Sequence, residues 1–213
     1  MNQKNIKAII FDCDGTLVSS EMPTASLITE ILLNNGYRTD IDEILHISRG
    51  EKLSVLAEKL QGMFPGLDTR SLIQAYNGQI LNKLNTDLAP DQATVDVIKN
   101  LQLPKCVASN GSRERTEIAL KATGLFGFFN GLVVSGYDIN AWKPDPKIID
   151  FSARLLNKKP EECLVIDDSI DGLKAGLAAG AQVASFRISN EKLGELKNYV
   201  AQINNLDEIF NLI

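Results

Sequence analysis

Histidine and cysteine are scarce in this sequence, and their scarcity excludes several kinds of chemistry. Of its 213 residues, one is a histidine, His46, and three are cysteines, none of which forms a Cys-x-x-Cys pair. A structural zinc site takes about four such ligands, so we expect none here. Three cysteines cannot all pair, and each lies in or beside an apolar stretch, so we expect small buried thiols.

The cysteines also lack the arginine on which a cysteine phosphatase depends. Such an enzyme places an arginine six residues after its nucleophilic cysteine to hold the phosphate. The residues at that spacing here are Ser19, Ser112 and Ser169. Phosphate chemistry on a cysteine thiolate is therefore disfavoured.

Positive charge and long apolar runs are in short supply as well. The 22 lysines and arginines are outnumbered by 27 aspartates and glutamates, which gives a net charge of −5. An acidic balance argues against binding to nucleic acid or to an anionic membrane. No apolar run approaches the roughly 20 residues that span a bilayer. The first residues carry no signal-peptide pattern, so we expect a cytoplasmic protein.

The most informative feature that is present is a pair of carboxylates at the end of an apolar strand. The run 8–11 leads directly into Asp12 and Asp14. Residues two apart in a strand share one face, so the two carboxylates crowd the edge of a sheet. Such pairs bind a hard cation, carry out chemistry, or do both. A calcium loop of the EF-hand type does not fit, because its sixth and twelfth positions would be Leu17 and Pro23.

Three further groups of polar residues follow along the chain, and together with the pair Asp12 and Asp14 we call them the four stations. Ser109–Gly111 ends a short apolar strand, and backbone N–H groups in such a turn can bind an anion. Lys143 stands in a turn stiffened by prolines. Asp167 and Asp168 end another apolar strand. Acid, hydroxyl, cation and acid are thus placed, in that order, after successive strands.

The pattern of apolar stretches predicts an α/β fold. Short apolar strands near 7–12, 105–109, 132–135, 163–167 and 182–186 alternate with helical patterns. This alternation predicts a doubly wound, Rossmann-like parallel sheet covered by helices on both faces. Ligands bind beyond the carboxyl ends of such strands, which is where all four stations fall. A last apolar stripe, from Leu206 to Ile213, predicts a closing helix.

The segment after the first carboxylate pair carries helical patterns only. We therefore expect two domains: a catalytic core of residues 1–17 and 88–213, and a small helical domain of residues 18–87 inserted into it. The two connections, near 18–20 and 87–90, would serve as hinges.

The four stations together resemble the motifs of the haloacid dehalogenase superfamily of phosphohydrolases. The motifs are matched in chain order by Asp12 with Asp14, by Ser109, by Lys143, and by Asp167 with Asp168. The match spans nearly the whole chain. The residues around the first and third motifs are similar to those of the 6-phosphogluconate phosphatases and the beta-phosphoglucomutase-like sugar phosphatases. The helical insert resembles the C1-type cap of this superfamily.

The resemblance implies a magnesium-dependent phosphomonoester hydrolase that forms an aspartyl-phosphate. Asp12 would attack phosphorus, and Asp14 would protonate the leaving alkoxide and then take a proton from water. The side chains of Asp12, Asp167 and Asp168, with the main-chain carbonyl of Asp14, would hold Mg²⁺, or Mn²⁺ in its place.

The same resemblance assigns the residues that bind the phosphate. Lys143 would neutralise Asp12 and the phosphoryl oxygens, so that one anion can approach another. Ser109, with the backbone at Asn110 and Gly111, would hydrogen-bond the transferring group. The expected partner is a small phosphorylated metabolite, bound by a monomer without nucleic acid or membrane.

Substrate choice is expected to come from the helical domain. Arg49, Gly50 and Lys52 lie between two helical patterns and bring cations into an acidic protein. Arg49 suits a carboxylate or a second phosphate, so a sugar-acid phosphate such as 6-phosphogluconate would fit. A solvated polar loop explains the same residues equally well.

Several alternatives stay open beside hydrolysis. The nearest is a sugar phosphomutase related to beta-phosphoglucomutase, but such mutases carry a histidine where this chain has Thr24. A 2-haloacid dehalogenase is disfavoured because that branch lacks the second acid, which is Asp14 here. A two-component receiver domain has no helical insert and a different order of acids. A non-catalytic phosphate-binding protein is a remote alternative, since every core motif residue is present.

Overall fold

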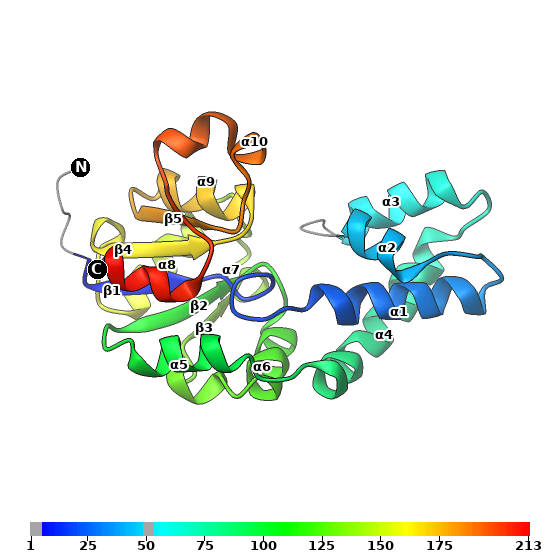
Figure 1. The fold of residues 1–213 in the computed structure, drawn as a ribbon, viewed down its shortest axis with the longest axis horizontal. Helices are drawn as coiled ribbons and strands as arrows, with labels where there is room; N and C mark the ends of the chain where they lie inside the picture. The colour runs from blue at the N-terminus through cyan, green and yellow to red at the C-terminus, as the bar shows by residue number, and fades with distance from the viewer. Residues whose placement is uncertain (1–5, 49–52) are drawn as a thin grey trace. The chain divides into compact units, whose positions relative to one another are not determined.

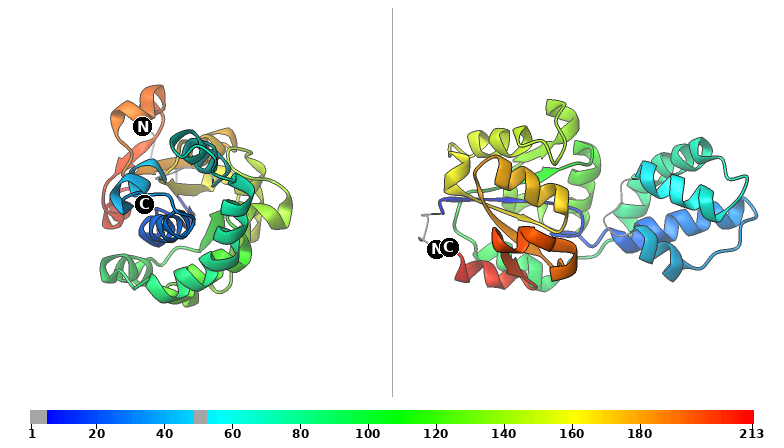
Figure 2. Two further views of the ribbon diagram at one scale, coloured as in Figure 1. Left: turned by 90° about the vertical axis from the view of Figure 1, so that its right-hand side faces the viewer. Right: turned by 90° about the horizontal axis from the view of Figure 1, so that it is seen from above.

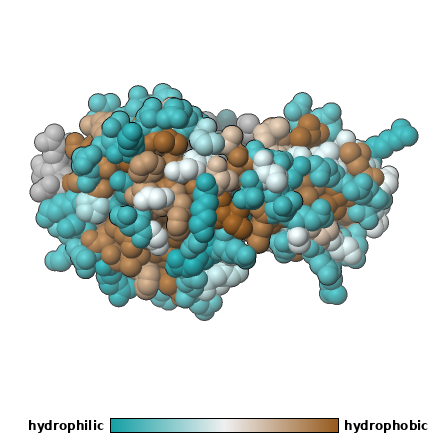
Figure 3. Space-filling model, turned by 90° about the horizontal axis from the view of Figure 1, so that it is seen from below, coloured by the Kyte–Doolittle hydropathy of each residue, from teal (hydrophilic) through white to brown (hydrophobic). Residues whose placement is uncertain are grey.

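The computed structural model describes residues 6–48 and 53–213 (Figure 1). The chain forms two compact units, one of Met1–Val18 with Pro90–Ile213 and the other of Ser19–Ala89. We call the first the core unit and the second the helical unit. Within the described ranges, no helix is long and apolar enough to cross a membrane. Hydrophilic residues are abundant on the surface of both units in the face that Figure 3 shows.

A six-stranded parallel sheet forms the centre of the core unit, with the strand order β3-β2-β1-β4-β5-β6. Its strands are β1 (Ala8–Phe11), β2 (Lys105–Ser109), β3 (Val133–Ser135), β4 (Cys163–Asp167), β5 (Gln182–Phe186) and β6 (Ala201–Ile203). Because all pairs are parallel, all strands end at the same edge. The order reverses between β1 and β4, the point at which open α/β sheets bind their ligands.

Helices cover both faces of this sheet (Figure 2). On one face α8 (Lys147–Leu155) packs on β1, β2 and β3, and α9 (Ile170–Ala178) packs on β4 and β5. On the other face α5 (Gln92–Asn100) contacts the 3₁₀ helix η4 (Leu206–Asn211). The remaining helices are α6 (Arg113–Ala122), η1 (Phe126–Phe129), α7 (Gly136–Ile139), η2 (Pro160–Glu162), α10 (Asn190–Leu193) and η3 (Gly194–Asn198). The predicted doubly wound sheet is confirmed.

The alternation of strand side chains carries the first and fourth motifs to one side of the sheet. Ile10 of β1 and Val165 of β4 belong to the buried cluster that includes Leu173 of α9. Asp12 and Asp167 stand two residues further along and keep the same alternation, since the ladder continues with the Asp12 N–H donating to the carbonyl of Ile166 at 2.9 Å. Both carboxylates therefore leave the sheet on the side of α8 and α9.

The helical unit consists of α1 (Glu21–Asn34), α2 (Ile41–Ser48), α3 (Leu53–Met63) and α4 (Thr69–Asp87). Helix α1 packs on α2 and α4, and α3 packs on α4. The buried apolar side chains of this unit include Leu27, Ile28, Leu32, Ile44, Leu56, Leu60, Leu72, Ile80 and Leu84. The helical character predicted for the insert is thus observed.

Two short elements differ from the sequence-based expectation. Helix α2 was not among the expected apolar faces, although Ile41, Ile44 and Leu45 recur at helical spacing; Ile44 is its one fully buried apolar residue. The closing helix expected from Leu206 onward is a short 3₁₀ helix, whose start is fixed by a capping box between Asn205 and Glu208.

Candidate active site

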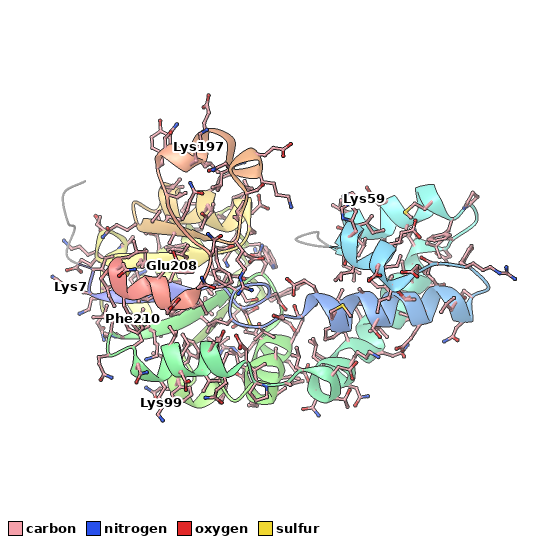
Figure 4. The ribbon with its side chains drawn as sticks, viewed as in Figure 1. Lys7, Lys59, Lys99, Lys197, Glu208 and Phe210 are labelled. Carbon is pink, nitrogen blue, oxygen red and sulfur yellow. The ribbon has the colours of Figure 1, made fainter. Side chains whose placement is uncertain are left out.

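Three side chains of the predicted motifs meet where β1 and β4 end. The ammonium of Lys143 donates to Asp12 Oδ1 at 2.5 Å and to Asp167 Oδ2 at 2.7 Å. Lys143 is 3% exposed and Asp167 is fully buried. Loss of either partner would therefore leave an uncompensated buried charge. Lys99 and Lys197, by contrast, point outward from the surface in Figure 4.

Lys143 is held in place through its main chain by the loop of the second motif. Its N–H donates to Asn110 Oδ1 at 2.7 Å, and Asn110 Nδ2 donates back to the Lys143 carbonyl at 3.2 Å. Ser135 reinforces the link by donating from its hydroxyl to the Gly111 carbonyl at 2.6 Å. The side chain of Asn110 is thus a clamp between two motifs, a role that its sequence position did not indicate.

The loop that follows β2 is folded back on itself. Ser109 is buried, and its Oγ accepts a hydrogen bond from the Gly111 N–H at 2.9 Å. Ser112 then caps α6 by accepting from the Arg115 N–H at 3.3 Å. The predicted phosphate-binding residues, Ser109, Asn110 and Gly111, are therefore the turn that begins this helix, a place where anions are favoured.

Asp12, Asp167 and Asp168 are the described acidic side chains that come close enough to share a cation. Each offers a carboxylate oxygen, and these oxygens lie within 4.8 Å of one another. Lys143 brings an ammonium to this group, in contact with Asp12 and Asp167. An all-oxygen donor set of this kind suits Mg²⁺ or Mn²⁺.

Two glycines make the room that these carboxylates occupy. A Cβ on Gly172 would overlap the carboxylate of Asp167, and a Cβ on Gly15 would overlap that of Asp168. Gly15 also has φ +85°, a left-handed conformation that glycine adopts without strain. The backbone thus forms a close-fitting cradle for two of the three acids, which supports the fit of a cation to this site.

Asp167 is also oriented from the helix that follows it. Its Oδ1 accepts from the Ser169 N–H at 2.9 Å and from the Ser169 hydroxyl at 2.6 Å. The Ser169 oxygen in turn accepts from the Gly172 N–H at 3.0 Å, as the N-cap of α9. The start of α9 therefore fixes Asp167, and Asp167 fixes Lys143.

The charges in this cluster shift one another's titration. Burial raises the pKa of Asp12 well above its ordinary value, Lys143 opposes this, and Asp167 and Asp168 add to it. Burial disfavours the ammonium of Lys143, but the carboxylates of Asp12 and Asp167 outweigh burial and raise the pKa of Lys143. Lys143 is therefore protonated at neutral pH.

Asp14 is separate from the three-carboxylate group. It lies in a tight turn in which the Gly15 N–H donates to the Val18 carbonyl at 2.8 Å. Its Oδ1 accepts from Arg115 Nη2 at 3.2 Å, and its side chain is 32% exposed. Arg115 was not singled out from the sequence, although an arginine in the first turn after the second motif was a signal that could have been read.

The remaining predicted residues lie apart from this cluster or outside the described ranges. Arg49, Gly50 and Lys52 lie outside the described residues. The cysteines are buried and free, as expected. In the helical unit, the hydroxyls of Thr24 and Tyr76 lie 3.3 Å apart.

Comparisons with known proteins agree with this geometry. Residues 6–180 match the model of the haloacid dehalogenase-like hydrolases. The chain is 28% identical over 183 residues to the 6-phosphogluconate phosphatase of Escherichia coli (strain K12), covering 85% of this chain and 82% of that protein. It is 26% identical to the pyrophosphatase PpaX of Bacillus velezensis, covering 86% of this chain and 84% of that protein.

A solved structure resembles the whole chain. It is the crystal structure of a conserved haloacid dehalogenase-like protein of unknown function from Agrobacterium tumefaciens str. C58. The TM-score is 0.81 at 25% identity, and the match covers 97% of each chain. The topology of the sheet together with its helical insert is therefore shared with that protein.

Proposed function

Because this chain belongs to the haloacid dehalogenase-like hydrolases, we propose that the cluster at the ends of β1 and β4 is a phosphatase active site with Asp12 as its nucleophile. The family match confirms the resemblance seen in the four motifs, and the chain is a phosphatase of this family. The contact of Lys143 with both Asp12 and Asp167 carries the proposal, because it places a buried cation against the attacking carboxylate.

In the first half of the reaction a carboxylate oxygen of Asp12 attacks phosphorus. The bond from phosphorus to the leaving oxygen breaks, and the phosphoryl group passes to Asp12. Lys143 balances the charge on Asp12 and on the phosphoryl oxygens. Asp14 gives its proton to the leaving oxygen, so that an alcohol rather than an alkoxide departs.

In the second half water replaces the alcohol. Asp14, now a carboxylate, takes a proton from a water molecule whose oxygen attacks phosphorus. The bond between phosphorus and the Asp12 oxygen breaks, and inorganic phosphate leaves. Asp12 is restored as a carboxylate, and Asp14 again holds a proton. Ser109 and the main chain at Asn110 and Gly111 bind the phosphoryl group through both steps.

The site requires a cation besides Lys143. The side chains of Asp12, Asp167 and Asp168, with the main-chain carbonyl of Asp14, would hold Mg²⁺ or Mn²⁺. Such an ion acts as a Lewis acid on the phosphoryl oxygens and offsets the excess negative charge. The approach of one carboxylate oxygen from each of Asp12, Asp167 and Asp168 to within 4.8 Å of one another supports this assignment.

The proposed substrate is a small phosphorylated metabolite, and within that class a sugar phosphate or a sugar-acid phosphate such as 6-phosphogluconate. The likeness to a 6-phosphogluconate phosphatase supports this choice. Arg49 and Lys52 would supply cations for the acid group. Thr24, at the position where mutases carry histidine, favours hydrolysis over phosphoryl return. We also propose that the enzyme acts as a monomer in the cytoplasm.

Phosphate release from a substrate panel tests this function. The panel contains 6-phosphogluconate, glucose 6-phosphate, fructose 1-phosphate, phosphoglycolate and pyrophosphate, each with Mg²⁺ and with chelator. We expect Mg²⁺-dependent release that falls at least about 1,000-fold in Asp12→Asn, since this variant has no nucleophile. Asp150→Asn, on α8 and outside the site, is the matched control and keeps its activity. Release that survives in Asp12→Asn would contradict the proposal, and an isomerised sugar phosphate without release would indicate a mutase.

A further inference from the structure

The proposed mechanism makes no use of Arg115, although this residue touches its acid. Arg115 Nη2 donates to Asp14 Oδ1 at 3.2 Å, from the first turn of α6. We propose that Arg115 is a positioning residue that holds the Asp14 carboxylate where it exchanges a proton with the leaving oxygen. The inference rests on the proposed function, in which Asp14 is the acid and base.

The base of the Arg115 side chain is fixed by the loop that binds the phosphoryl group. The main-chain N–H of Arg115 donates to the hydroxyl oxygen of Ser112, the N-cap of α6, at 3.3 Å. Gly111 lies beside the side chain, because a Cβ built on this glycine would be 3.7 Å from Arg115 Cδ. The arginine therefore passes along the loop of the second motif and reaches the turn of the first.

Asp12 and Asp14 are held by different cations. Asp12 is held by the buried ammonium of Lys143, whereas the Asp14 side chain is 32% exposed and lies in the turn after β1. The Arg115 side chain is 23% exposed, so this ion pair is partly shielded from water. A charge-assisted hydrogen bond from a planar guanidinium restricts the rotation of the carboxylate. Asp12 is thus paired with Lys143, which also binds Asp167, and Asp14 is paired with Arg115.

Arg113 provides a natural comparison within the same turn of α6. Its guanidinium is 2.7 Å from Asp138 Oδ2, with a side chain 45% exposed. This pair lies between α6 and α7 and involves no residue of the proposed mechanism. Exposed pairs of this kind contribute little to stability. Arg113→Gln is therefore the matched control for Arg115→Gln.

The dependence of the rate on the leaving group separates positioning of Asp14 from general damage. An alkyl phosphate needs a proton on its leaving oxygen, whereas 4-nitrophenyl phosphate expels a stable anion and needs little help from an acid. The parameter kcat/KM reports the steps up to departure of the leaving group. We would measure it with the best sugar phosphate of the panel and with 4-nitrophenyl phosphate, in the Mg²⁺-loaded enzyme.

Arg115→Gln is expected to lower kcat/KM about 10- to 100-fold for the sugar phosphate, since a small misplacement of an acid loses much of its effect. The loss for 4-nitrophenyl phosphate stays within about 3-fold, because that reaction makes little use of the acid. Arg115→Lys keeps a cation and falls between the two. In an Asp14→Asn background, Arg115→Gln has little further effect, because the two residues act as one unit.

Equal losses on both substrates would overturn the proposal, as would no loss on either. The same holds for a full additional loss in the Asp14→Asn background, or for a matching loss in Arg113→Gln. Failure of the phosphatase proposal itself is seen separately, in wild-type protein that hydrolyses neither compound or in an Asp12→Asn variant that keeps its activity. Thermal unfolding of each variant checks that all of them are folded.

Discussion

Gly172 and Ser169, at the start of α9, determine where the carboxylate of Asp167 lies. Gly172 leaves the space that Asp167 fills, and Ser169 orients the same carboxylate through two hydrogen bonds. Asp167 then binds Lys143, which binds Asp12. The proposed nucleophile, Asp12, is therefore positioned through a chain of contacts that begins at the first turn of α9.

Gly172→Ala tests this chain of contacts. The added methyl group would displace Asp167, so both the cation site and the anchor of Lys143 should suffer. We expect phosphate release to fall about 10- to 100-fold, as is typical when groups that orient metal ligands are removed, and Mg²⁺ affinity measured by calorimetry to fall with it. Gly127→Ala is the control, because a Cβ there has no atom within 4 Å. Unchanged Mg²⁺ binding in Gly172→Ala would refute the role given to this glycine.

The three thiols are expected to be inert in the folded protein. Burial raises the pKa of Cys106 to about 12 and that of Cys163 to about 11, and it raises the pKa of Cys13 as well. A raised thiol pKa means that the reactive thiolate is nearly absent at neutral pH. Titration with a disulfide reagent should detect no thiol in the native state and all three after unfolding. Rapid reaction of one thiol in native protein would show that its strand opens locally.

At the scale of single elements, the helical unit offers a test of stability that is independent of catalysis. Gly78 lies in the interior of α4, and a Cβ there would meet no atom within 4 Å. Alanine loses less conformational freedom than glycine in a helix, so Gly78→Ala should stabilise the fold by about 0.5–1 kcal/mol. Chemical unfolding followed by circular dichroism measures this change. Destabilisation would mean that this position is crowded or does not stay helical.

The elements best predicted from the sequence are the apolar strands that end in acidic residues. β1 and β4 are marked by apolar runs that end in acids, and the parallel sheet follows from them. β6 is only three residues long and has no comparable run, and it is fixed by pairing with β5 that one sequence does not display. The Asn110 clamp on Lys143 joins residues 33 apart, and the Arg115–Asp14 pair joins residues 101 apart. Local spacing cannot indicate contacts over such distances.

At the scale of the whole molecule, the predicted catalytic residues all lie in one of the two units. Asp12, Asp14, Ser109, Lys143, Asp167 and Asp168 all belong to the core unit. The helical unit has its own hydrophobic core and contains the Thr24–Tyr76 contact. We propose that the chemistry lies in the core unit and substrate choice in the helical unit, so that substitutions at these six residues should lower the rate for every sugar phosphate.

The central claim is that the phosphoryl group passes through Asp12, and direct trapping of this species is the most decisive measurement. In Asp14→Asn the base for the second half is missing, while 4-nitrophenyl phosphate can still donate its phosphoryl group without an acid. Acid quench of this variant with Mg²⁺ and 4-nitrophenyl phosphate, followed by peptide mass spectrometry, should find one phosphoryl group on Asp12. It should find none when Asp12→Asn is added. A phosphoryl group on any other residue, or turnover without Asp12, would contradict the account.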